Sequence, residues 1–306
     1  MTLYREYRPG AFDEFYGNDT TLNSLQAILK RPKAEIPHAF LFYGMTGCGK
    51  TTLARIVAER LGCWGDHDFV ELDTADFRGI DTIREIRKQM HYKPIESACR
   101  VWILDECQKL TGDGQSAMLK ALEDTPDHVY FILCTTDPQK LLPTIRNRCT
   151  SFEVQPLSQQ DMTDLLLGIS GAEGKEVDRE IVAQICQDSL GSPRNALQIL
   201  EKIIDLDGPA QAEAAKNEAA TQNAVIDLCR ALIDKKKRWG DIAKIIKGLE
   251  KEDPERIRQA VLGYCSSILL NGENDKAFLV MDCFREPSFN NGRAGLIMNA
   301  YSVYVS

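Results

Sequence analysis

The chain has 306 residues, a formal net charge of −8 and 43% hydrophobic residues. This length predicts two or three domains, and the composition is that of an ordinary globular protein. The acidic balance argues against a nucleic-acid footprint over the whole surface, and no apolar run approaches the roughly 20 residues that a membrane-spanning helix needs.

The cysteine pattern indicates a reducing compartment. The chain has ten cysteines, none forms a C-x-x-C pair, and several lie in apolar runs, as Cys134 does. Cysteines used in this way behave as small buried hydrophobic residues. Cys63 and His67 suggest zinc only weakly, because no second pair of ligands is near them. Residues 1–6 contain no apolar h-region, so we expect no signal peptide and a cytoplasmic location.

Residues 5–18 are aromatic-rich and irregular, and they precede a predicted helix whose N-cap is Asp19 or Thr20. One interpretation is an arm that packs on the core. The other is a base-binding arm, because aromatic side chains such as Phe15 and Tyr16, just upstream of a nucleotide site, can line an adenine pocket. The residues alone do not decide between the two interpretations.

A phosphate-binding loop is the strongest motif in the chain. The apolar run 39–43 predicts a strand, a glycine-rich segment follows at 44–51, and a helical pattern with Leu53 and Val57 on one side comes next. The glycines let backbone N–H groups turn inward on an anion, and the helix N-terminus adds partial positive charge. The alternative is a plain glycine turn between a strand and a helix.

This loop predicts a site for ATP and Mg²⁺. Lys50 would reach the β- and γ-phosphates, and the Thr51 hydroxyl would ligate Mg²⁺. The residues of this stretch that we expect to bind the nucleotide are Gly44, Met45, Thr46, Gly47, Cys48, Gly49, Lys50, Thr51 and Thr52.

The next predicted elements are a strand at 68–72 and a helix at 80–90. Apolar residues at helical spacing form one face of this helix, and the other face carries Arg84, Arg87 and Lys88. A solvated face is the default interpretation of such charges.

A second chemical motif occupies residues 100–106, where four apolar residues end in Asp105 and Glu106. The pattern predicts a buried parallel strand with an acidic carboxyl-terminal tip. We expect that tip to lie beside the phosphate-loop strand, at the ligand end of the sheet. Asp105 would hold Mg²⁺ through water, and Glu106 would orient or deprotonate the attacking water.

A helix at 115–123 and a strand at 129–134 follow, and Thr135 and Thr136 come directly after that strand. These hydroxyls would bond the attacking water or the γ-phosphate, or they would only cap a turn. A last strand is predicted at 151–154.

From Pro156 onward the pattern is helical only. The predicted helices are 161–167, 178–186 and 194–204, with a largely helical segment after residue 208. We therefore predict an α/β domain at 1–156, a small helical domain at 157–207 and a second helical domain at 208–306.

The order of these motifs resembles that of the AAA+ clamp-loader ATPases. It is similar to the γ/τ (DnaX) subunit of the bacterial replicase, to replication factor C small subunits and to tailed-phage clamp loaders. The motifs that carry the resemblance are Tyr7-Arg8-Pro9, Phe12-Asp13-Glu14, the phosphate loop, Gly79-Ile80-Asp81, Leu104-Asp105-Glu106, residues 119–124, residues 135–140, Ile145-Arg146-Asn147-Arg148-Cys149 and residues 191–197. The resemblance implies an AAA+ P-loop parallel-sheet domain, a helical lid and an all-α oligomerising collar.

The resemblance also implies roles for single residues. Thr136 falls at the sensor-1 position, which reads the γ-phosphate. Arg148 falls in the motif that supplies an arginine finger to the neighbouring subunit's ATP, where its charge would stabilise the γ-phosphoryl oxygens. Arg194 falls at the sensor-2 position of the lid, and Arg8 with its neighbours would belong to the adenine pocket.

In clamp loaders, helix N-termini from successive subunits follow the DNA backbone. The resemblance therefore makes candidate DNA contacts of Ile80, Asp81, Arg84, Arg87, Lys88 and Lys109, against the alternative of a solvated face. The loop at 92–95 is a candidate contact with the clamp.

The sequence departs from the bacterial γ/τ pattern in several positions. Asn147 replaces a serine of the finger motif, and Gln108 stands where bacterial relatives often have histidine. Residues 62–67 leave no room for the γ/τ zinc module, and we expect the protein to lack the long C-terminal tail of that subunit. These departures favour a phage-like or replication-factor-C-like subunit.

The leading hypothesis is a motor subunit that uses ATP to open a sliding clamp and place it on primer–template DNA. Its expected partners are the clamp, the DNA and the other members of a five-subunit ring, with no membrane. The alternatives are another AAA+ ATPase of replication or recombination, such as a helicase loader, and a non-catalytic stator of a clamp-loader ring.

Overall fold

A computed structural model describes residues 2–65, 67–77, 79–206, 224–225, 227–234, 237–250, 252–271, 273–286 and 292–305. The chain forms two compact units, Met1–Gly208 and Pro209–Ser306, and each is described by itself. Among the described residues, no helix is both long and apolar enough to cross a lipid bilayer.

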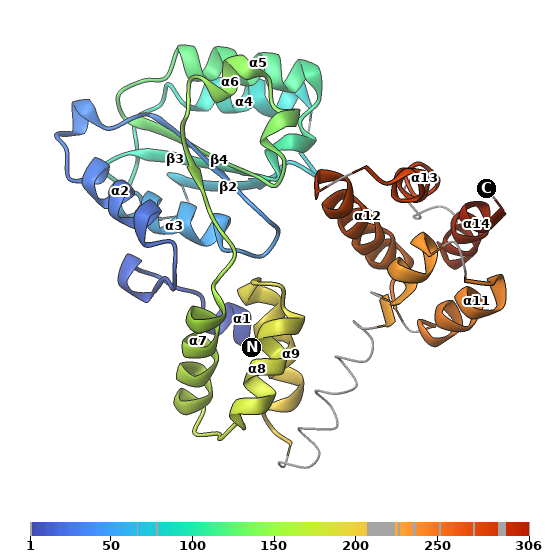
Figure 1. Cartoon of the computed structure of the whole chain (residues 1–306). Coiled ribbons are helices and arrows are strands. Elements are labelled where there is room, and N and C mark those ends of the chain that lie inside the picture. Colours follow the sequence, from blue (N-terminus) through green and yellow to red (C-terminus); the bar gives the residue numbers. More distant parts are fainter. Residues whose placement is uncertain are drawn as a thin grey trace. The chain divides into compact units, whose positions relative to one another are not determined.

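The first unit is built on a five-stranded parallel sheet (Figure 1). Its strands are β1 (Ala39–Tyr43), β2 (Phe69–Asp73), β3 (Arg100–Asp105), β4 (Val129–Thr135) and β5 (Thr150–Glu153), in the spatial order β2-β3-β4-β1-β5. All neighbouring pairs are parallel. Because parallel sheets are covered on both faces, their strands are near-continuous apolar runs, as predicted for β1, β3 and β4.

Helices cover both faces of the sheet (Figure 1). The helices of the α/β part are α1 (Leu3–Glu6), α2 (Asp19–Leu29), α3 (Lys50–Arg60), α4 (Ile80–Gln89), α5 (Gly112–Glu123) and α6 (Pro143–Arg146). Phe40 and Phe42 of β1 pack in one core with α2 and α3, whereas Leu41 packs in the other core with α4, α5 and α6. This alternation follows from the two-residue period of a strand. Short 3₁₀ turns lie at Phe12–Glu14, Lys33–Glu35, Cys107–Lys109 and Pro138–Lys140.

The expectation that the Asp105 strand lies beside the phosphate-loop strand is wrong. β4 lies between them, paired with β1 on one side and with β3 on the other. The order of strands along the chain does not fix their order in the sheet, because crossover helices let a later strand insert between earlier ones. The insertion brings Thr135, at the end of β4, between the two tips.

The N-cap expected for the first long helix is also wrong, because Asn18 and not Asp19 or Thr20 precedes α2. Asn18 has φ 61° and makes no capping bond with its side chain. Its amide instead donates to the carbonyl of Gln155 and accepts from the Gln155 N–H, at 3.1 and 2.7 Å. A long-range contact therefore takes the side chain away from the local capping role that its position suggests.

Three helices complete the first unit: α7 (Gln159–Ala172), α8 (Arg179–Asp188) and α9 (Pro193–Ile203). Each begins with a side-chain cap, from Ser158, Asp178 and Ser192 respectively. These capped helices confirm the helical patterns predicted after Pro156. No strand follows β5 in the part of the chain that the structure describes.

The second unit is helical, with α11 (Trp239–Gly248), α12 (Pro254–Asn271), α13 (Asp275–Cys283) and α14 (Gly292–Val305) around its own apolar core. Arg258 of α12 is buried, pairs with Glu255 and donates to the carbonyls of Phe284 and Arg285 beyond α13. A buried guanidinium satisfied in this way ties two helices together. Residues 207–223, at the start of the predicted second helical domain, lie outside the described residues.

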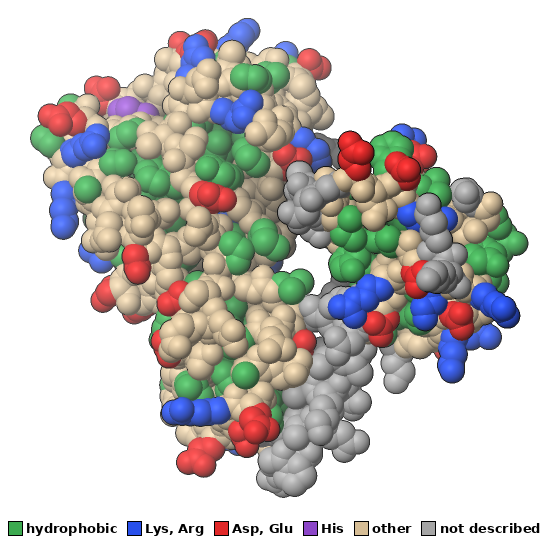
Figure 2. All heavy atoms as spheres, in the orientation of Figure 1, with side chains coloured by type: hydrophobic (Ala, Val, Ile, Leu, Met, Phe, Trp, Pro, Cys, Tyr) green, Lys and Arg blue, Asp and Glu red, His purple; other side chains and the backbone are tan. Residues whose placement is uncertain are grey.

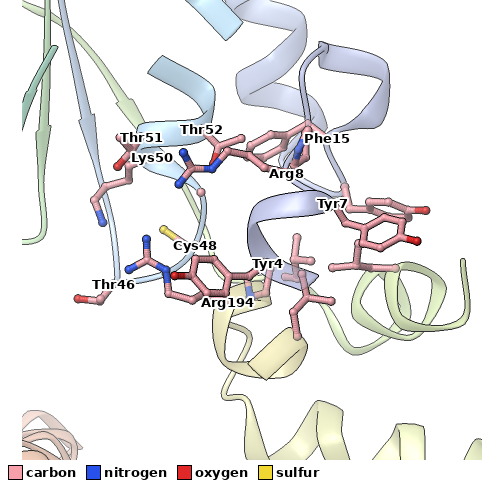
Figure 3. A pocket seen from close by; sticks show the side chains of 18 of the residues that line it. Tyr4, Tyr7, Arg8, Phe15, Thr46, Cys48, Lys50, Thr51, Thr52 and Arg194 are labelled. Atoms are coloured by element: carbon pink, nitrogen blue, oxygen red, sulfur yellow. The ribbon is translucent and has the colours of Figure 1, made fainter. Parts of the chain in front are cut away.

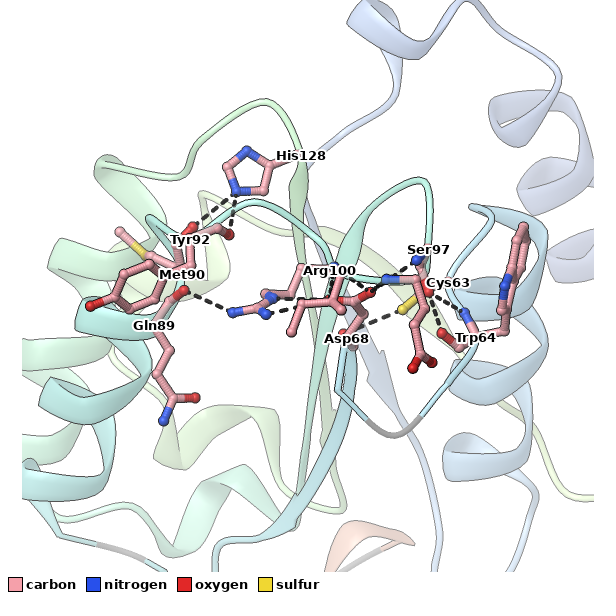
Figure 4. Close-up of polar contacts among 11 residues, drawn as sticks. Cys63, Trp64, Asp68, Gln89, Met90, Tyr92, Ser97, Arg100 and His128 are labelled. Carbon is pink, nitrogen blue, oxygen red and sulfur yellow. Dashed lines mark hydrogen bonds and ion pairs between the residues drawn. The ribbon is translucent and has the colours of Figure 1, made fainter.

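A buried ion pair holds the edge of the sheet together (Figure 4). Asp68 is fully buried and accepts hydrogen bonds from the backbone N–H groups of Ile95, Glu96 and Ser97 at 2.8 to 3.0 Å. Arg100 pairs with Asp68 at 3.3 Å and also donates to the carbonyl of Gln89, the last residue of α4. The loop before β3, the strand itself and the end of α4 are thus fixed to one carboxylate.

We predict that Asp68→Asn destabilises the first unit by about 3 kcal/mol at pH 7, because it leaves the buried Arg100 charge unpaired. Burial alone would raise the pKa of Asp68, but the three backbone N–H groups and Arg100 outweigh it and lower the pKa. The carboxylate therefore stabilises the fold above its unfolded pKa near 4, and this contribution is lost as the pH falls through the lower folded value.

Urea unfolding of the Asp68→Asn and wild-type chains between pH 7 and pH 3 tests this. The stability difference is expected to shrink below about pH 4. Asp81→Asn is the matched control, since Asp81 is exposed in a surface pair and is expected to change stability by less than about 0.5 kcal/mol. A difference that is constant over the whole pH range would contradict the role of the charge.

Candidate functional site

The phosphate loop joins β1 to α3 and depends on three glycines with positive φ: Gly44, Gly47 and Gly49. A Cβ atom on Gly44 would lie 2.1 Å from the carbonyl oxygen of Val154, just after β5. On Gly47 it would lie 2.4 Å from the Ser192 hydroxyl, and on Gly49 it would lie 2.8 Å from the ring of Phe15. The loop is therefore packed so closely on the sheet, α9 and the arm that it has no room for side chains at these positions.

Two side chains hold the loop from within. Lys50 is buried, and its Nζ donates to the carbonyls of Gly44 and Met45 at 3.0 and 2.8 Å. The Cys48 thiol donates to Met45 and Val154 carbonyls at 2.8 and 3.2 Å. Burial raises the pKa of this thiol, so it stays protonated.

The two predicted metal ligands lie side by side. The Thr51 hydroxyl, on α3, donates to Asp105 Oδ2 at 2.7 Å, although the preceding strand β1 is not a neighbour of β3 in the sheet. The other carboxylate oxygen, Oδ1, accepts from the Glu106 backbone N–H at 2.9 Å. A hydroxyl and a carboxylate at the mouth of a phosphate loop form an oxygen donor set of the kind that Mg²⁺ prefers, so these residues fit the ion.

Glu106 has a left-handed backbone, with φ 52° and ψ 35°. This conformation is uncommon for a residue other than glycine and is characteristic of functional sites. It is held in part by Thr74, whose hydroxyl donates to the Glu106 carbonyl at 2.7 Å. The turn brings the carboxylate to the cavity next to the phosphate loop.

Gln108 connects Glu106 to the end of β4. Its Nε2 donates to Glu106 Oε2 and, at 2.8 Å, to the Thr136 hydroxyl. Its Oε1 accepts from the buried Thr135 hydroxyl at 2.7 Å. In the sequence, Gln108 stands out only as a departure from the γ/τ pattern, and its nearness to Glu106 is the one signal for this role. Thr136 thus touches the carboxylate's partner and does not itself line the cavity.

A cavity brings most of the predicted nucleotide contacts together (Figure 3). Its empty space, open solvent included, is about 910 Å³. Predicted residues in its lining are Arg8, Phe15, Tyr16, Thr46, Gly47, Cys48, Gly49, Lys50, Thr51, Thr52, Asp105, Glu106 and Arg194. Tyr7 and Pro9, the sequence neighbours of Arg8, line it as well. Lining residues that sequence reasoning missed are Tyr4, Leu157, Leu165, Pro193 and Leu197.

These missed residues lie on α1, just before α7, on α7 itself and on α9, so the cavity lies between the arm, the phosphate loop and the helical lid. The arm packs on the core and also lines the cavity, and base binding by the arm stays a prediction. Phe15 is buried in the core against the loop, Tyr16 is exposed, and both line the cavity. No local pattern could reveal the lid residues, because only the packing of distant helices brings them here.

The cavity carries several positive charges. Lys50, Arg8 and Arg194 all line it. Burial lowers the pKa of Arg8, and the charges of Arg55 and Arg194 act in the same direction. Like charges gathered around one cavity favour a polyanionic ligand, since such a ligand relieves their mutual repulsion.

Arg148 does not line this cavity. It precedes β5, at the amino end of the parallel sheet, whereas the phosphate loop follows the carboxyl end of β1. Its guanidinium pairs with Glu123 at 2.5 Å and donates to the Thr144 carbonyl at 3.3 Å. Arg148 is therefore directed away from the chain's own phosphate loop.

The candidate DNA contacts lie on and near α4. Ile80 and the buried Ile83 pack on the core, and the cations of the opposite face are paired with acids. The pairs are Arg84 with Asp81 at 3.1 Å, Arg87 with Asp124 at 3.2 Å and Lys88 with Glu85 at 3.6 Å. Lys109 is exposed in the turn after β3.

The ten cysteines are all free thiols. Within the described ranges, no group of three or more His, Cys, Asp or Glu side chains is arranged to hold a metal ion.

A family model described as "DNA polymerase III, delta subunit" matches residues 65–158. Among solved structures, the chain is similar to the Thermotoga maritima RuvB Holliday junction branch migration motor, with a TM-score of 0.57 and 20% identity over 88% of this chain and 87% of that one. At this identity the likeness shows the fold alone, which is that of an AAA+ α/β domain with helical regions after it.

Curated sequence relatives are DNA polymerase III subunits. The gamma/tau subunit of Mycobacterium bovis is 32% identical over 335 aligned positions, which cover 97% of this chain and 57% of the relative. The tau subunit of Bacillus subtilis is 30% identical over 88% of this chain and 52% of its own length. The chain is thus similar in sequence to gamma/tau subunits over nearly its whole length. It spans little more than half of the length of these relatives, and the preference for a phage-like or replication-factor-C-like origin stays a prediction.

We predict that Gly44→Ala destabilises the first unit by at least about 2 kcal/mol, since the new Cβ would collide with a backbone oxygen and φ is +152°. Urea unfolding measures the loss. Gly112→Ala is the matched control, because nothing lies within 4 Å of a Cβ there and the site is in α5, where alanine is favourable. Equal unfolding midpoints for the two variants would show that the loop is not packed as described.

Proposed function

We propose that the chain is the ATP-hydrolysing motor subunit of a clamp loader, which opens a sliding clamp and places it on primer–template DNA. The observation that carries the proposal is the cavity in which Lys50, Thr51, Asp105 and Glu106 come together beside a lid arginine. The gamma/tau relatives favour clamp loading over the helicase-loader alternative. A non-catalytic stator would have no need of these side chains together.

The cavity residues divide the chemistry of hydrolysis among them. Lys50 and the loop N–H groups bind the β- and γ-phosphates, and Thr51 with Asp105 would hold Mg²⁺, which when bound neutralises phosphate charge. Glu106 accepts a proton from the attacking water or orients it. Gln108 holds the Glu106 carboxylate through its 2.5 Å hydrogen bond, and it connects that carboxylate to Thr136 at the sensor-1 position.

The arginine finger acts between subunits. Arg148 lies at the opposite end of the sheet from the phosphate loop of its own chain, so it reaches only a neighbour's triphosphate. A planar guanidinium suits the charge that spreads over the γ-phosphoryl oxygens. Engagement replaces the carboxylate of Glu123 by phosphate as the partner of Arg148.

DNA is bound locally, by the first turn of α4 with Ile80 and Asp81, by the cations Arg84, Arg87 and Lys88, and by Lys109. Figure 2 shows acidic and basic side chains interspersed on the face that it presents. Because each α4 cation already has an acidic partner, DNA phosphates must displace carboxylates as well as counterions there. The backbone N–H groups at the start of α4 are free of this competition.

In this proposal the chain consists of a P-loop domain at 1–156, a lid at 157–207 and a collar at 208–306. The collar carries an exposed apolar strip on one side of α14, formed by Ile297, Met298, Tyr301, Tyr304 and Val305. These residues recur at helical spacing and therefore share a face. We assign this strip to contacts with neighbouring subunits of a ring, because solvent-exposed apolar patches mark interfaces.

The direct test is ATP hydrolysis by the full chain, mixed with its partner subunit, clamp and primed DNA. Turnover is expected to rise when clamp and DNA are both present. Glu106→Gln is expected to bind ATP within about twofold of wild type and to hydrolyse it at least about 100-fold more slowly, since it keeps the shape and loses the base. Turnover that ignores clamp and DNA, or an undiminished rate in Glu106→Gln, would sink the proposal.

A complementation assay tests the trans finger. Arg148→Ala and Glu106→Gln are each expected to be nearly inactive alone. In an equal mixture, about a quarter of the interfaces combine an intact Glu106 with an intact Arg148 from the neighbour, so activity returns to about that share of wild type. If Arg148 acted within its own chain, mixing would restore nothing.

A further inference from the structure

The short helix α1, which no sequence pattern predicted, contributes a side chain to the lining of the cavity. Leu3 is buried and anchors the helix, which packs against α9 of the lid. Tyr4, the next residue, turns its ring into the lining of the cavity. An aromatic ring is thus held at the point where the arm meets the lid.

Arg194, the second residue of α9, has a fixed backbone. Ser192 caps α9 by accepting from the Asn195 N–H at 3.3 Å, and its hydroxyl donates to the Gly47 carbonyl at 3.4 Å. A Cβ on Gly47 would lie 3.3 Å from the Cβ of Arg194. The start of the Arg194 side chain therefore touches the phosphate loop.

Beyond its Cβ atom, the Arg194 side chain extends to the ring of Tyr4. The guanidinium carbon of Arg194 lies 5.8 Å from the centre of the Tyr4 ring, and Figure 3 shows the two side chains together beside the loop. Within the described part of the chain, no carboxylate or carbonyl accepts a hydrogen bond from Arg194, whose side chain is exposed. Without the ring, this long side chain would sample many rotamers.

We propose that Tyr4 is a positioning residue, which holds the Arg194 guanidinium over the phosphate loop by a cation–π contact. The inference rests on the proposed function, in which Arg194 binds the triphosphate. The ring is itself oriented by Arg5, whose Nε donates to the Tyr4 hydroxyl at 3.2 Å. The electron-rich face attracts the guanidinium while leaving its N–H groups free for phosphate oxygens, which a carboxylate partner would not do.

The experiment measures equilibrium binding of ATP with Mg²⁺ to the full chain. Tyr4→Leu is expected to weaken binding about three- to fivefold, the value of an exposed cation–π contact. Tyr4→Phe keeps the ring and is expected to stay within about twofold of wild type. In the Arg194→Gln background, Tyr4→Leu is expected to cause no further loss, because the two residues then act as one unit.

A graded series guards against a variant that misfolds. Phenylalanine and increasingly fluorinated phenylalanines at position 4 keep the shape of the ring and withdraw its electrons, so ATP affinity is expected to fall stepwise with fluorination. Equal affinity across the series, or additive losses in the double variant, would overturn the role of Tyr4. If Arg194→Gln itself binds and hydrolyses ATP as wild type does, the assignment of Arg194 in the proposed function fails, and the inference fails with it.

Discussion

The close approach of the phosphate loop to three other parts of the chain is the constraint on which the site depends. Gly44 meets the end of β5, Gly47 meets the first turn of α9, and Gly49 meets Phe15 of the arm. Each contact is possible only because these residues lack a Cβ atom. The loop is therefore the place where the sheet, the lid and the arm meet.

The order of the strands in the sheet positions the candidate catalytic side chains relative to the phosphate loop. Because β4 lies between β1 and β3, the threonines at its end stand between the loop strand and the acidic strand. Gln108 uses this arrangement to join Thr135 and Thr136 to Glu106. The carboxylate that would act on water is thus held by Gln108, which the two threonines fix in turn, and it follows a left-handed backbone at Glu106.

Much of this architecture could be predicted from the sequence, because it is local. The strand–loop–helix order around Lys50, the apolar run ending in Asp105 and the helical spacing after Pro156 are patterns within short segments, and they yielded the fold class and most of the cavity lining. Asn18, Tyr4 and Leu197 could not be predicted, since their roles come from partners more than a hundred residues away. The left-handed backbone of Glu106 could not be predicted either, because a glutamate, unlike a glycine, gives no sequence signal for this conformation.

A thiol within a nucleotide-binding loop would ordinarily expose the site to alkylation and oxidation. Cys48 escapes this because its side chain is 1% exposed and directs its hydrogen toward carbonyl oxygens of the loop and of Val154. Electrophiles and peroxides attack the thiolate, and both burial and these bonds keep that form scarce. The Cys48 sulfur therefore lies in the phosphate loop as a buried, unreactive packing atom, and its burial and hydrogen bonds protect it from oxidation.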